Sequence, residues 1–360
     1  MQSVIIGPNQ AGQRFDKFLH KYMPEAPNSF LYKMLRKKNI TLNGKKAEGK
    51  EMLKEGDEVK MFFAEETLAK FTGSTQSAYS ENTGVRSCQT SPLQKLINQY
   101  KKAYDTIKGI TVIYEDSHTL ILNKPSGILT QKASDQDLSL NEWLIGYLLQ
   151  NGSITQKELQ SFKPSVCNRL DRNTSGLVIC GKSLAGSQAL SRLIHDREIR
   201  KFYRTITCGL LKDSELIEGY LVKNEKTNTV KVYPVSGKKP DTEETLIKTA
   251  YHPLAQFSSC NGNRNIPGGL TYLEVELITG KTHQIRAHLA STGHPLIGDY
   301  KYGQKNSNGF FREQFHLSSQ LLHAYRLEFP EMAGVLSGLS NQVIIAPLPA
   351  CFTEILGGCS

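Results

Sequence analysis

The residues with the clearest chemical potential lie in the stretch 167–180, where a polar turn runs into an apolar strand. Asp171 stands in this turn, between Arg169 and Arg172. The run from Leu177 to Cys180 is short and continuously apolar, which is typical of a buried strand. A carboxylate at the mouth of a rigid strand, with cations beside it, is placed to act on a bound substrate. The alternative is an ordinary turn, in which the aspartate bonds to its own backbone.

A second polar stretch, Thr279 to Pro295, predicts a helix that Thr282 caps. On this helix Arg286 follows His283 by three residues, so the two side chains share one face. An arginine at a helix start can pair with Asp171, which keeps the carboxylate ionised and fixes its orientation. The alternative for Arg286 is a purely structural ion pair.

The same stretch holds three histidines within twelve residues, which raises the question of a metal site. His283 and His288 are five residues apart, or about 140° around a helix, so they do not converge on one ion. We therefore expect no metal in this protein.

Composition bounds the class of protein. A length of 360 residues favours two domains, and the net charge of +10, with a pI near 9.1, favours an anionic partner such as nucleic acid or an acidic membrane. No apolar run approaches the length of a membrane span, and the first residues lack the pattern of a secretory signal. The seven cysteines include no Cys-x-x-Cys pair, which argues against a disulfide framework or a zinc knuckle and favours a reducing, cytoplasmic location.

Residues 1–65 have the pattern of a small separate unit. Two short amphipathic helices are expected, the second capped by Ser29, followed by a hairpin around Asn43-Gly44. Of the twelve Lys and Arg residues in this unit, six fall between positions 33 and 46, a span without an acidic residue. A solvated helix face is the plain explanation of such a cluster. An RNA-phosphate surface is the functional one, formed by Lys33, Arg36, Lys37, Lys45 and Lys46.

The remaining chain divides in two. Residues 66–108 are predicted to be a polar linker, Ser/Thr-rich at 72–84, with a short helix near 93–104. Residues 109–360 contain many alternating or apolar runs with a few helical segments and hairpin-length connections. This pattern predicts an α+β domain with a mainly antiparallel mixed sheet flanked by helices.

Two resemblances follow from these segments. The basic helix, the hairpin and the final strand of residues 1–65 resemble the S-four (alpha-L) RNA-binding domain. From about 110 to 330 the chain resembles the RluA-type family of pseudouridine synthases, through five blocks that occur in order. These blocks are Asn123-Lys124-Pro125-Ser126-Gly127 with Glu115-Asp116 before it, residues 169–176, Lys201-Phe202-Tyr203-Arg204, residues 280–286 with 294–299, and Leu322-His323-Ala324.

The resemblance implies an RNA uridine isomerase that needs no cofactor. It assigns Asp171 as the nucleophile, without saying whether the carboxylate attacks the sugar or the base. Arg286 would pair with Asp171, and Tyr203 would pack flat against the target base and help to move its proton. The plain alternative for Tyr203 is a core aromatic of a strand. Arg169 would fill the space that the flipped base vacates.

The substrate expected from the resemblance is large-subunit ribosomal RNA. Transfer RNA and a non-catalytic RNA-binding or ribosome-assembly factor are the alternatives. The expected partner is RNA without a membrane, and a monomer is expected. One residue departs from the family pattern: Asn168 stands where many members have histidine, and asparagine does not titrate near neutral pH.

Overall fold

The computed structural model describes residues 2–72, 92–160, 162–235, 244–260 and 268–359. Its first part folds around a four-stranded antiparallel sheet in the order β1-β4-β2-β3. The strands are β1 (Gln2–Ile5), β2 (Ile40–Leu42), β3 (Lys45–Lys46) and β4 (Glu58–Met61), and two helices accompany them, α1 (Phe15–Tyr22) and α2 (Asn28–Arg36). Asn43 and Gly44 both have positive φ and join β2 to β3, as the Asn-Gly pair predicts.

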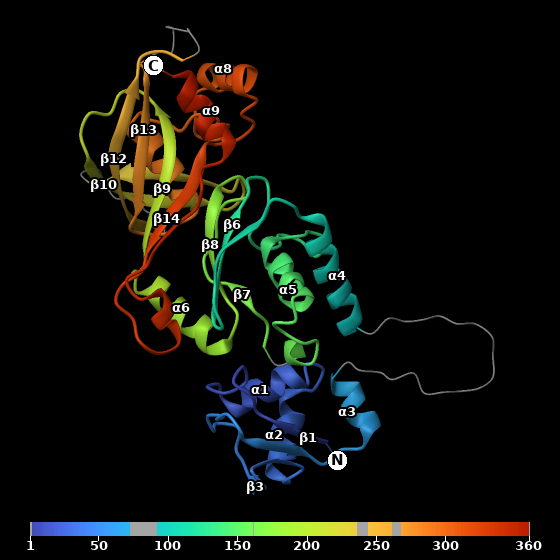
Figure 1. The fold of residues 1–360 in the computed structure, drawn as a ribbon. Helices are drawn as coiled ribbons and strands as arrows, with labels where there is room; N and C mark the ends of the chain where they lie inside the picture. Colours follow the sequence, from blue (N-terminus) through green and yellow to red (C-terminus); the bar gives the residue numbers. More distant parts are fainter. Residues whose placement is uncertain (1, 73–91, 161, 236–243, 261–267, 360) are drawn as a thin grey trace, which may run out of the picture.

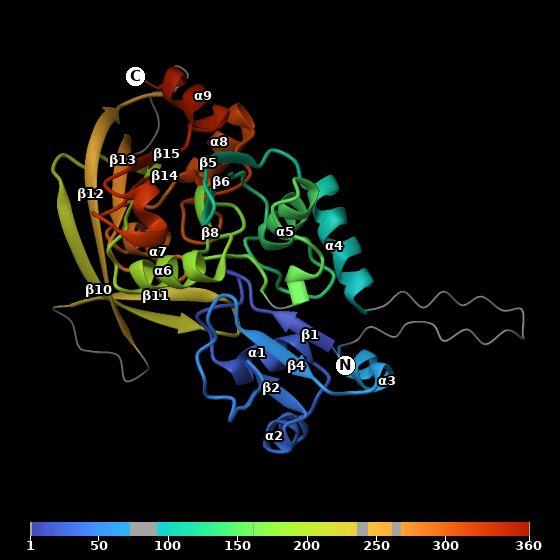
Figure 2. The same cartoon turned by 60° about the horizontal axis from the view of Figure 1, so that its bottom comes forward.

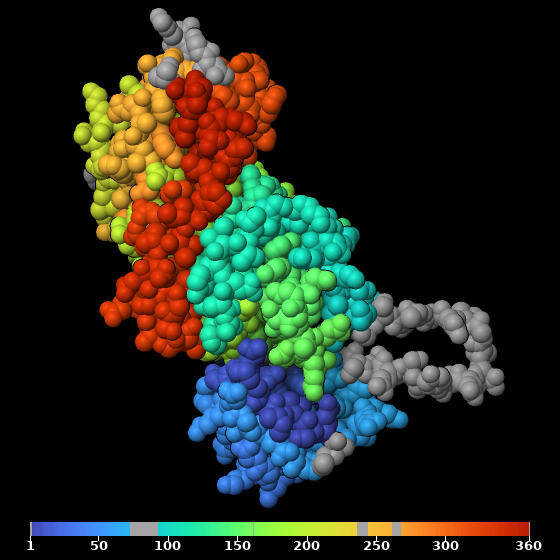
Figure 3. Space-filling model, viewed as in Figure 1, coloured from blue at the N-terminus to red at the C-terminus, as the bar shows by residue number. Residues whose placement is uncertain are grey.

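This N-terminal unit has its own apolar core, built from side chains between Val4 and Phe71. It forms a lobe at one end of the molecule (Figure 3). The expected cap of the second helix was wrong: α2 begins at Asn28 after Pro27, so Ser29 lies inside the first turn. Pro27 supplies the fixed φ of −61° that starts the helix without a side-chain cap.

The expected linker 66–108 carries a helix at each end. The first, α3 (Glu65–Thr72), packs back on the N-terminal core, where the rings of Phe71 and Phe30 lie 4.5 Å apart. The second, α4 (Pro92–Thr106), agrees with the helix predicted near 93–104 and lies along α5 (Leu140–Gln150) (Figures 1 and 2). Residues 73–91, with most of the Ser/Thr-rich stretch, fall outside the described part.

The large domain is built on one sheet in the order β11-β10-β12-β13-β9-β14-β8-β6-β5, with β7 beside β8 and β15 beside β14. Among the described strands, β8 and β14 pair in parallel and all other neighbours are antiparallel. The bounds are β5 (Thr111–Glu115), β6 (Thr119–Lys124), β7 (Ser165–Val166), β8 (Ser175–Gly181), β9 (Arg200–Cys208), β10 (Glu215–Asn224), β11 (Thr229–Pro234), β12 (Thr245–Phe257), β13 (Leu270–Leu277), β14 (Leu322–Glu328) and β15 (Val343–Ile345).

Helices flank this sheet, which confirms the predicted α+β architecture (Figure 1). Besides α4 and α5 they are α6 (Leu184–His195), α7 (Gln284–Ser291), α8 (Lys305–Phe315) and α9 (Ala350–Gly358), with short 3₁₀ turns η1 (Glu158–Gln160) and η2 (Gly334–Leu339). All seven residues of β8 are buried, as its apolar run predicts. None of the described helices is long and apolar enough to cross a membrane.

The parallel pair explains Gly176, the second residue of β8. Its φ is +110°, and a Cβ there would lie 2.2 Å from the carbonyl oxygen of Ala324 in β14. Only glycine lets the two backbones come this close. The strand that follows the Asp171 turn is therefore fixed at its first residues against the centre of the sheet.

The cysteine pattern of the sequence argues against disulfide bonding, and the structure corrects this expectation for one pair of cysteines. Cys260 and Cys359 form a disulfide across 99 residues and join the end of α9 to the segment after β12. Four other described cysteines are free thiols, Cys167, Cys180, Cys208 and Cys351. The absence of a Cys-x-x-Cys pair gave no information on this long-range pairing, because proximity here is set by the packing of α9.

Candidate active site

The turn that carries Asp171 is held by the segment that follows β6. The Lys124 ammonium donates to the carbonyl oxygens of Pro125, Ile128 and Arg172, at 3.0, 2.9 and 3.0 Å. All three of its hydrogens are therefore used inside the protein. One of the three bonds reaches across 48 residues to the residue after Asp171, so the two loops are joined directly behind the carboxylate.

Two further contacts fasten the same loops together. The Thr130 hydroxyl donates to the Leu170 carbonyl at 2.7 Å and accepts from the Leu170 amide at 3.1 Å. Ser126 donates to the Asn173 carbonyl at 2.9 Å. The backbone on both sides of Asp171 is thus bonded to residues 124–130, which fixes where the carboxylate lies.

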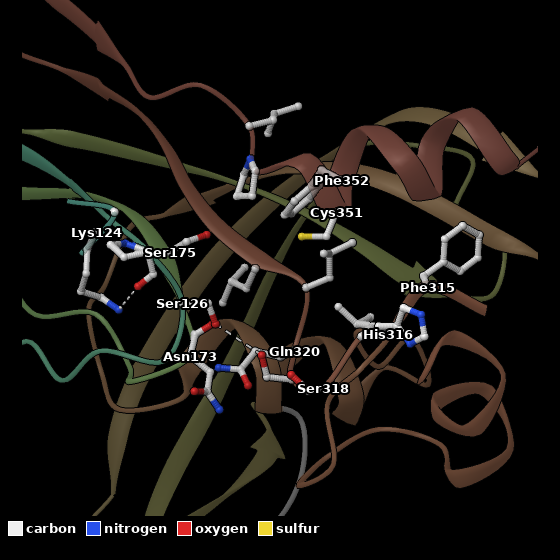
Figure 4. A pocket seen from close by; sticks show the side chains of 18 of the residues that line it. Lys124, Ser126, Asn173, Ser175, Phe315, His316, Ser318, Gln320, Cys351 and Phe352 are labelled. Atoms are coloured by element: carbon white, nitrogen blue, oxygen red, sulfur yellow. Dashed lines mark hydrogen bonds between the residues drawn. The ribbon is translucent and has the colours of Figure 1, made fainter. Parts of the chain in front are cut away.

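A cavity of about 390 Å³ lies beside these loops (Figure 4). Lys124, Ser126, Asn173 and Ser175 line one side, and the segments 315–322 and 347–352 line the other. Asp171 does not line this cavity. The candidate catalytic carboxylate is therefore on a different surface of the same loop.

Arg286 reaches Asp171 from α7, 115 residues further along the chain. Its Nη1 donates to Asp171 Oδ2 at 3.1 Å, as the sequence predicts. Its Nε and Nη2 form a two-pronged pair with Asp299, at 2.7 and 2.9 Å. Arg286 and Asp299 are 8% and 0% exposed at their side chains, whereas Asp171 is 26% exposed. Asp299 thus aims the guanidinium, and Asp171 is the member of the trio that faces solvent.

Electrostatics agrees with this arrangement. Burial alone would lower the pKa of Arg286, but the charges of Asp299 and Asp171 outweigh it and raise the pKa. Burial would raise the pKa of Asp299, but its bonds to Arg286 lower it. Both groups stay charged near neutral pH. Burial also lowers the pKa of Lys124 to about 7, against the opposing field of Asp171.

The start of α7 differs from the prediction. Thr282 does not cap the helix, which begins at Gln284 after His283 in the left-handed region, at φ 53°. No side chain caps this start, and the Gln284 side chain instead ties it to the sheet: its Nε2 donates to the Lys248 carbonyl and the Thr249 hydroxyl. Gln284 anchors the helix to β12, because those two partners belong to that strand, and Arg286 follows two residues later on the anchored helix.

His283 lies against the carboxylate as a consequence of this start. Its Nε2 is 3.8 Å from Asp171 Oδ2, and its Nδ1 is 2.9 Å from the Tyr302 hydroxyl. Burial, followed by the positive charge of Arg286 and Lys301, lowers the pKa of His283 more than Asp171 raises it. The imidazole is therefore neutral near neutral pH.

Tyr203 lies in β9 and belongs to the main apolar core, with 6% of its surface exposed. Burial, and to a smaller extent the charge of Asp171, raises its pKa. The phenol therefore keeps its proton near neutral pH, which is unfavourable for a base. The structure brings Tyr203 within the electrostatic reach of Asp171 and also gives it the core packing that was the alternative explanation.

The predicted RNA-binding residues are all exposed. Arg169 lies in the Asp171 turn of the large domain, whereas Lys33, Arg36, Lys37, Lys45 and Lys46 lie in the N-terminal unit. Within the described part of the chain, neither Arg169 nor Arg172 forms an ion pair with Asp171; Arg286 takes that place. No cluster of metal-binding side chains occurs among the described residues.

Sequence reasoning gave no role to Lys124, Asp299 or the imidazole of His283. A signal for Lys124 was present: it continues the fully buried positions Leu120 and Leu122 of β6 at a spacing of two, where a lysine is unusual. Asp299 offered no such local sign.

The candidate site lies within a segment that is similar to known proteins. The family model for RNA pseudouridylate synthases matches residues 118–291, which contain Asp171, Tyr203 and Arg286. The chain is 29% identical over 339 residues to ribosomal large subunit pseudouridine synthase C of Vibrio vulnificus, covering 92% of this chain and 90% of the relative. It is 27% identical over 349 residues to an uncharacterized RNA pseudouridine synthase of Mycoplasma capricolum, covering 96% and 97%.

Solved structures show the same fold. Human RNA Pseudouridylate Synthase Domain Containing 4 superposes with a TM-score of 0.53 at 21% identity, over 72% of this chain and 95% of that one. The matched segment and the names of the relatives indicate an RNA-modifying isomerase. The chain is similar to RNA pseudouridine synthases, which convert uridine to pseudouridine, over the matched segment and over most of the length of these relatives.

Proposed function

We propose that this enzyme isomerises uridines of large-subunit ribosomal RNA and that Asp171 is its nucleophile. The supporting observation is the asymmetry of the carboxylate. Oδ2 accepts from Arg286, while Oδ1 has no hydrogen-bond partner within the described chain. One oxygen is held, and the other is open to a substrate at a partly exposed site.

In the reaction the bond between N1 and the sugar C1′ breaks, the base turns, and C5 bonds to C1′. C5 loses a proton and N1 gains one, so no electrons leave the substrate and no cofactor is required. The base must first leave its stack to reach Asp171. Arg169 is exposed in the same turn and would occupy the space that the base leaves.

The choice of ribosomal RNA rests on the relatives named for the large subunit, from three Vibrio species. We propose that the N-terminal unit is an S-four-like module that docks this RNA through its exposed cations on α2 and β3. The net charge of +10 supports an extended phosphate surface. We further propose a monomer, because one chain contains both the docking unit and the site, and a cytoplasmic location, because the named bacterial relatives act on ribosomal RNA.

Pseudouridine mapping of ribosomal and transfer RNA, from cells with and without the gene, tests the function. We expect particular large-subunit positions to lose pseudouridine and to regain it with wild type but not with Asp171→Asn. Loss of pseudouridine from transfer RNA alone would identify transfer RNA, and not ribosomal RNA, as the substrate. An unchanged map, together with purified wild type inactive on unmodified transcripts, would favour a non-catalytic RNA-binding factor.

The docking role needs a separate measurement. Replacing Lys33, Arg36 and Lys37 by glutamine should lower the slope of log affinity against log salt by about 2 to 3, since each phosphate contact contributes about 0.7 to 0.9. A matched variant replaces three exposed lysines of the large domain, Lys157, Lys212 and Lys305. Equal slopes of log affinity against log salt in the two variants would show that the N-terminal cations have no special part in docking the RNA.

A further inference from the structure

His283 presents a hydrogen-bond donor beside the nucleophile. Its Nε2 lies 3.8 Å from Asp171 Oδ2, which is too long for a hydrogen bond. Within the described chain Nε2 has no other partner, and 10% of the side chain is exposed. An atom of the substrate at Asp171 can therefore reach this nitrogen.

The hydrogen bonds around Tyr302 determine which imidazole nitrogen carries the hydrogen. The Val230 amide donates to the Tyr302 oxygen at 3.0 Å, so that oxygen acts as an acceptor there. The phenol's own hydrogen then has His283 Nδ1, at 2.9 Å, as its partner. This arrangement gives the phenol hydrogen a partner when Nδ1 accepts, and the neutral ring then carries its own hydrogen on Nε2. The side chain is thus set as a donor toward Asp171, rather than as a base.

The two cations nearest to Asp171 are held by other protein groups. Lys124 uses its three hydrogens on backbone carbonyls, and Arg286 binds Asp299 and Asp171. The Tyr203 ring is packed in the core. The charged or titratable groups that act on His283 are Asp171, Arg286, Lys301, Asp299 and, through its hydroxyl, Tyr302. His283 is therefore the uncharged donor at this position.

We propose that His283 Nε2–H donates a hydrogen bond to a carbonyl oxygen of the target uracil and stabilises the negative charge that develops on the ring. If Asp171 attacks C1′, the electron pair of the broken N1–C1′ bond stays on uracil and spreads to its oxygens. If Asp171 attacks C6, the pair moves to the enolate oxygen at C4. In either case a fixed donor stabilises the charged ring, and no proton leaves the histidine. The inference rests on the proposed role of Asp171.

The left-handed backbone of His283 permits a direct test by substitution with glycine. At φ 53° glycine is unstrained, so His283→Gly removes the ring without distorting the start of α7. We expect the single-turnover rate with saturating enzyme to fall about 10²-fold, as for loss of one preorganised donor, with RNA affinity unchanged within about twofold. Imidazole added at about pH 8 should raise the single-turnover rate of His283→Gly at least tenfold. It can accept a hydrogen bond from Tyr302 and donate one to the substrate, as the histidine ring does.

Neutral 1-methylimidazole has the acceptor but no N–H, and it should give no rescue. His283→Gln, which carries an amide N–H on a longer side chain, should be at least tenfold faster than His283→Gly. His195→Gly is the matched control, because that side chain is 88% exposed and far along the chain on α6. Pseudouridine formation by wild type but not by Asp171→Asn tests the proposed function independently.

Three results would overturn the assignment. One is a single-turnover rate of His283→Gly that falls less than threefold below that of wild type. Another is equal rescue by imidazole and 1-methylimidazole, which would make the ring a base. The third is a loss of rate that is not relieved by added imidazole in His283→Gly and is equally large in His283→Gln, which would make the ring a structural support only.

Discussion

Asp299 lies behind the site without facing solvent, and neutralising it should disturb both folding and catalysis. Its carboxylate accepts four hydrogen bonds, two from Arg286 and two from the amides of Lys301 and Tyr302, at 2.9 and 3.1 Å. Asp299→Asn keeps the size of the side chain but removes the charge and one acceptor oxygen. Arg286 is then left 8% exposed, with Asp171 as its remaining carboxylate.

The expected cost follows from the burial. Removing one partner of a buried ion pair costs about 3 to 5 kcal/mol, because the other charge loses its compensation. Arg286 keeps Asp171, so we expect the lower end, about 3 kcal/mol. The single-turnover rate should fall about 10²-fold, because a guanidinium that loses its two-pronged anchor no longer fixes the nucleophile within 1 Å.

The chain offers a clean assay for the stability change. Trp143 is its single tryptophan and lies 6% exposed in α5, so urea unfolding followed by tryptophan fluorescence reports on the large domain. Asp135→Asn, at an exposed position, is the matched control. Adding Arg286→Met to Asp299→Asn should cost less than the sum of the single changes. A loss below about 1 kcal/mol in Asp299→Asn, with a rate within threefold of wild type, would refute this account.

Three other changes have defined outcomes. Lys124→Met leaves three carbonyl oxygens without their donor, and we expect about 3 kcal/mol of destabilisation in the same urea assay and a slower single-turnover rate. Burial lowers the pKa of His288 and of His323 from 6.5 to about 4, so between these values the unfolded chain binds more protons than the folded one. Stability should therefore fall as pH drops from 6.5 to 4, by up to about 3 kcal/mol for each histidine, and His323→Gln should flatten this dependence in pH-dependent melting. Gly176→Ala should cost at least about 3 kcal/mol or prevent folding, measured by thermal unfolding, since its Cβ would overlap the Ala324 carbonyl.

Local patterns were sufficient for most of the fold. The strand β8 falls where its apolar run predicts it, and the Asn43-Gly44 turn has the positive φ values that such a pair adopts. These features depend on neighbours in sequence, so a single chain reveals them.

Helix starts were less predictable, because tertiary contacts compete with local caps. Ser29 and Thr282 are both good capping residues by type. The chain begins α2 after Pro27 instead, and it begins α7 where Gln284 can bond to β12. The start of α7 is anchored by a side chain that reaches another strand, and no local pattern contains that strand.

The sequence predicts the charged pair of the site, but it does not predict the contacts that hold this pair in place. The pairing of Asp171 with Arg286 follows from the two motifs, although 115 residues separate them. The bond from Arg286 to Asp299 depends on how the loop after α7 returns, and the disulfide between Cys260 and Cys359 depends on where α9 packs. Such contacts are determined by three-dimensional packing, which composition and periodicity do not encode.

Asn168 shows why a departure from a family pattern can leave a site intact. Its Oδ1 accepts from the Ile179 amide at 2.7 Å, which joins the beginning of the Asp171 turn to the middle of β8. The Nδ1 of a histidine is separated from Cα by the same number of bonds and can accept in the same way. Asparagine and histidine therefore satisfy the same buried amide, and what this position requires is an acceptor at that distance. A titratable group is not needed there, because the charge that orients Asp171 comes from Arg286 on the other side of the carboxylate.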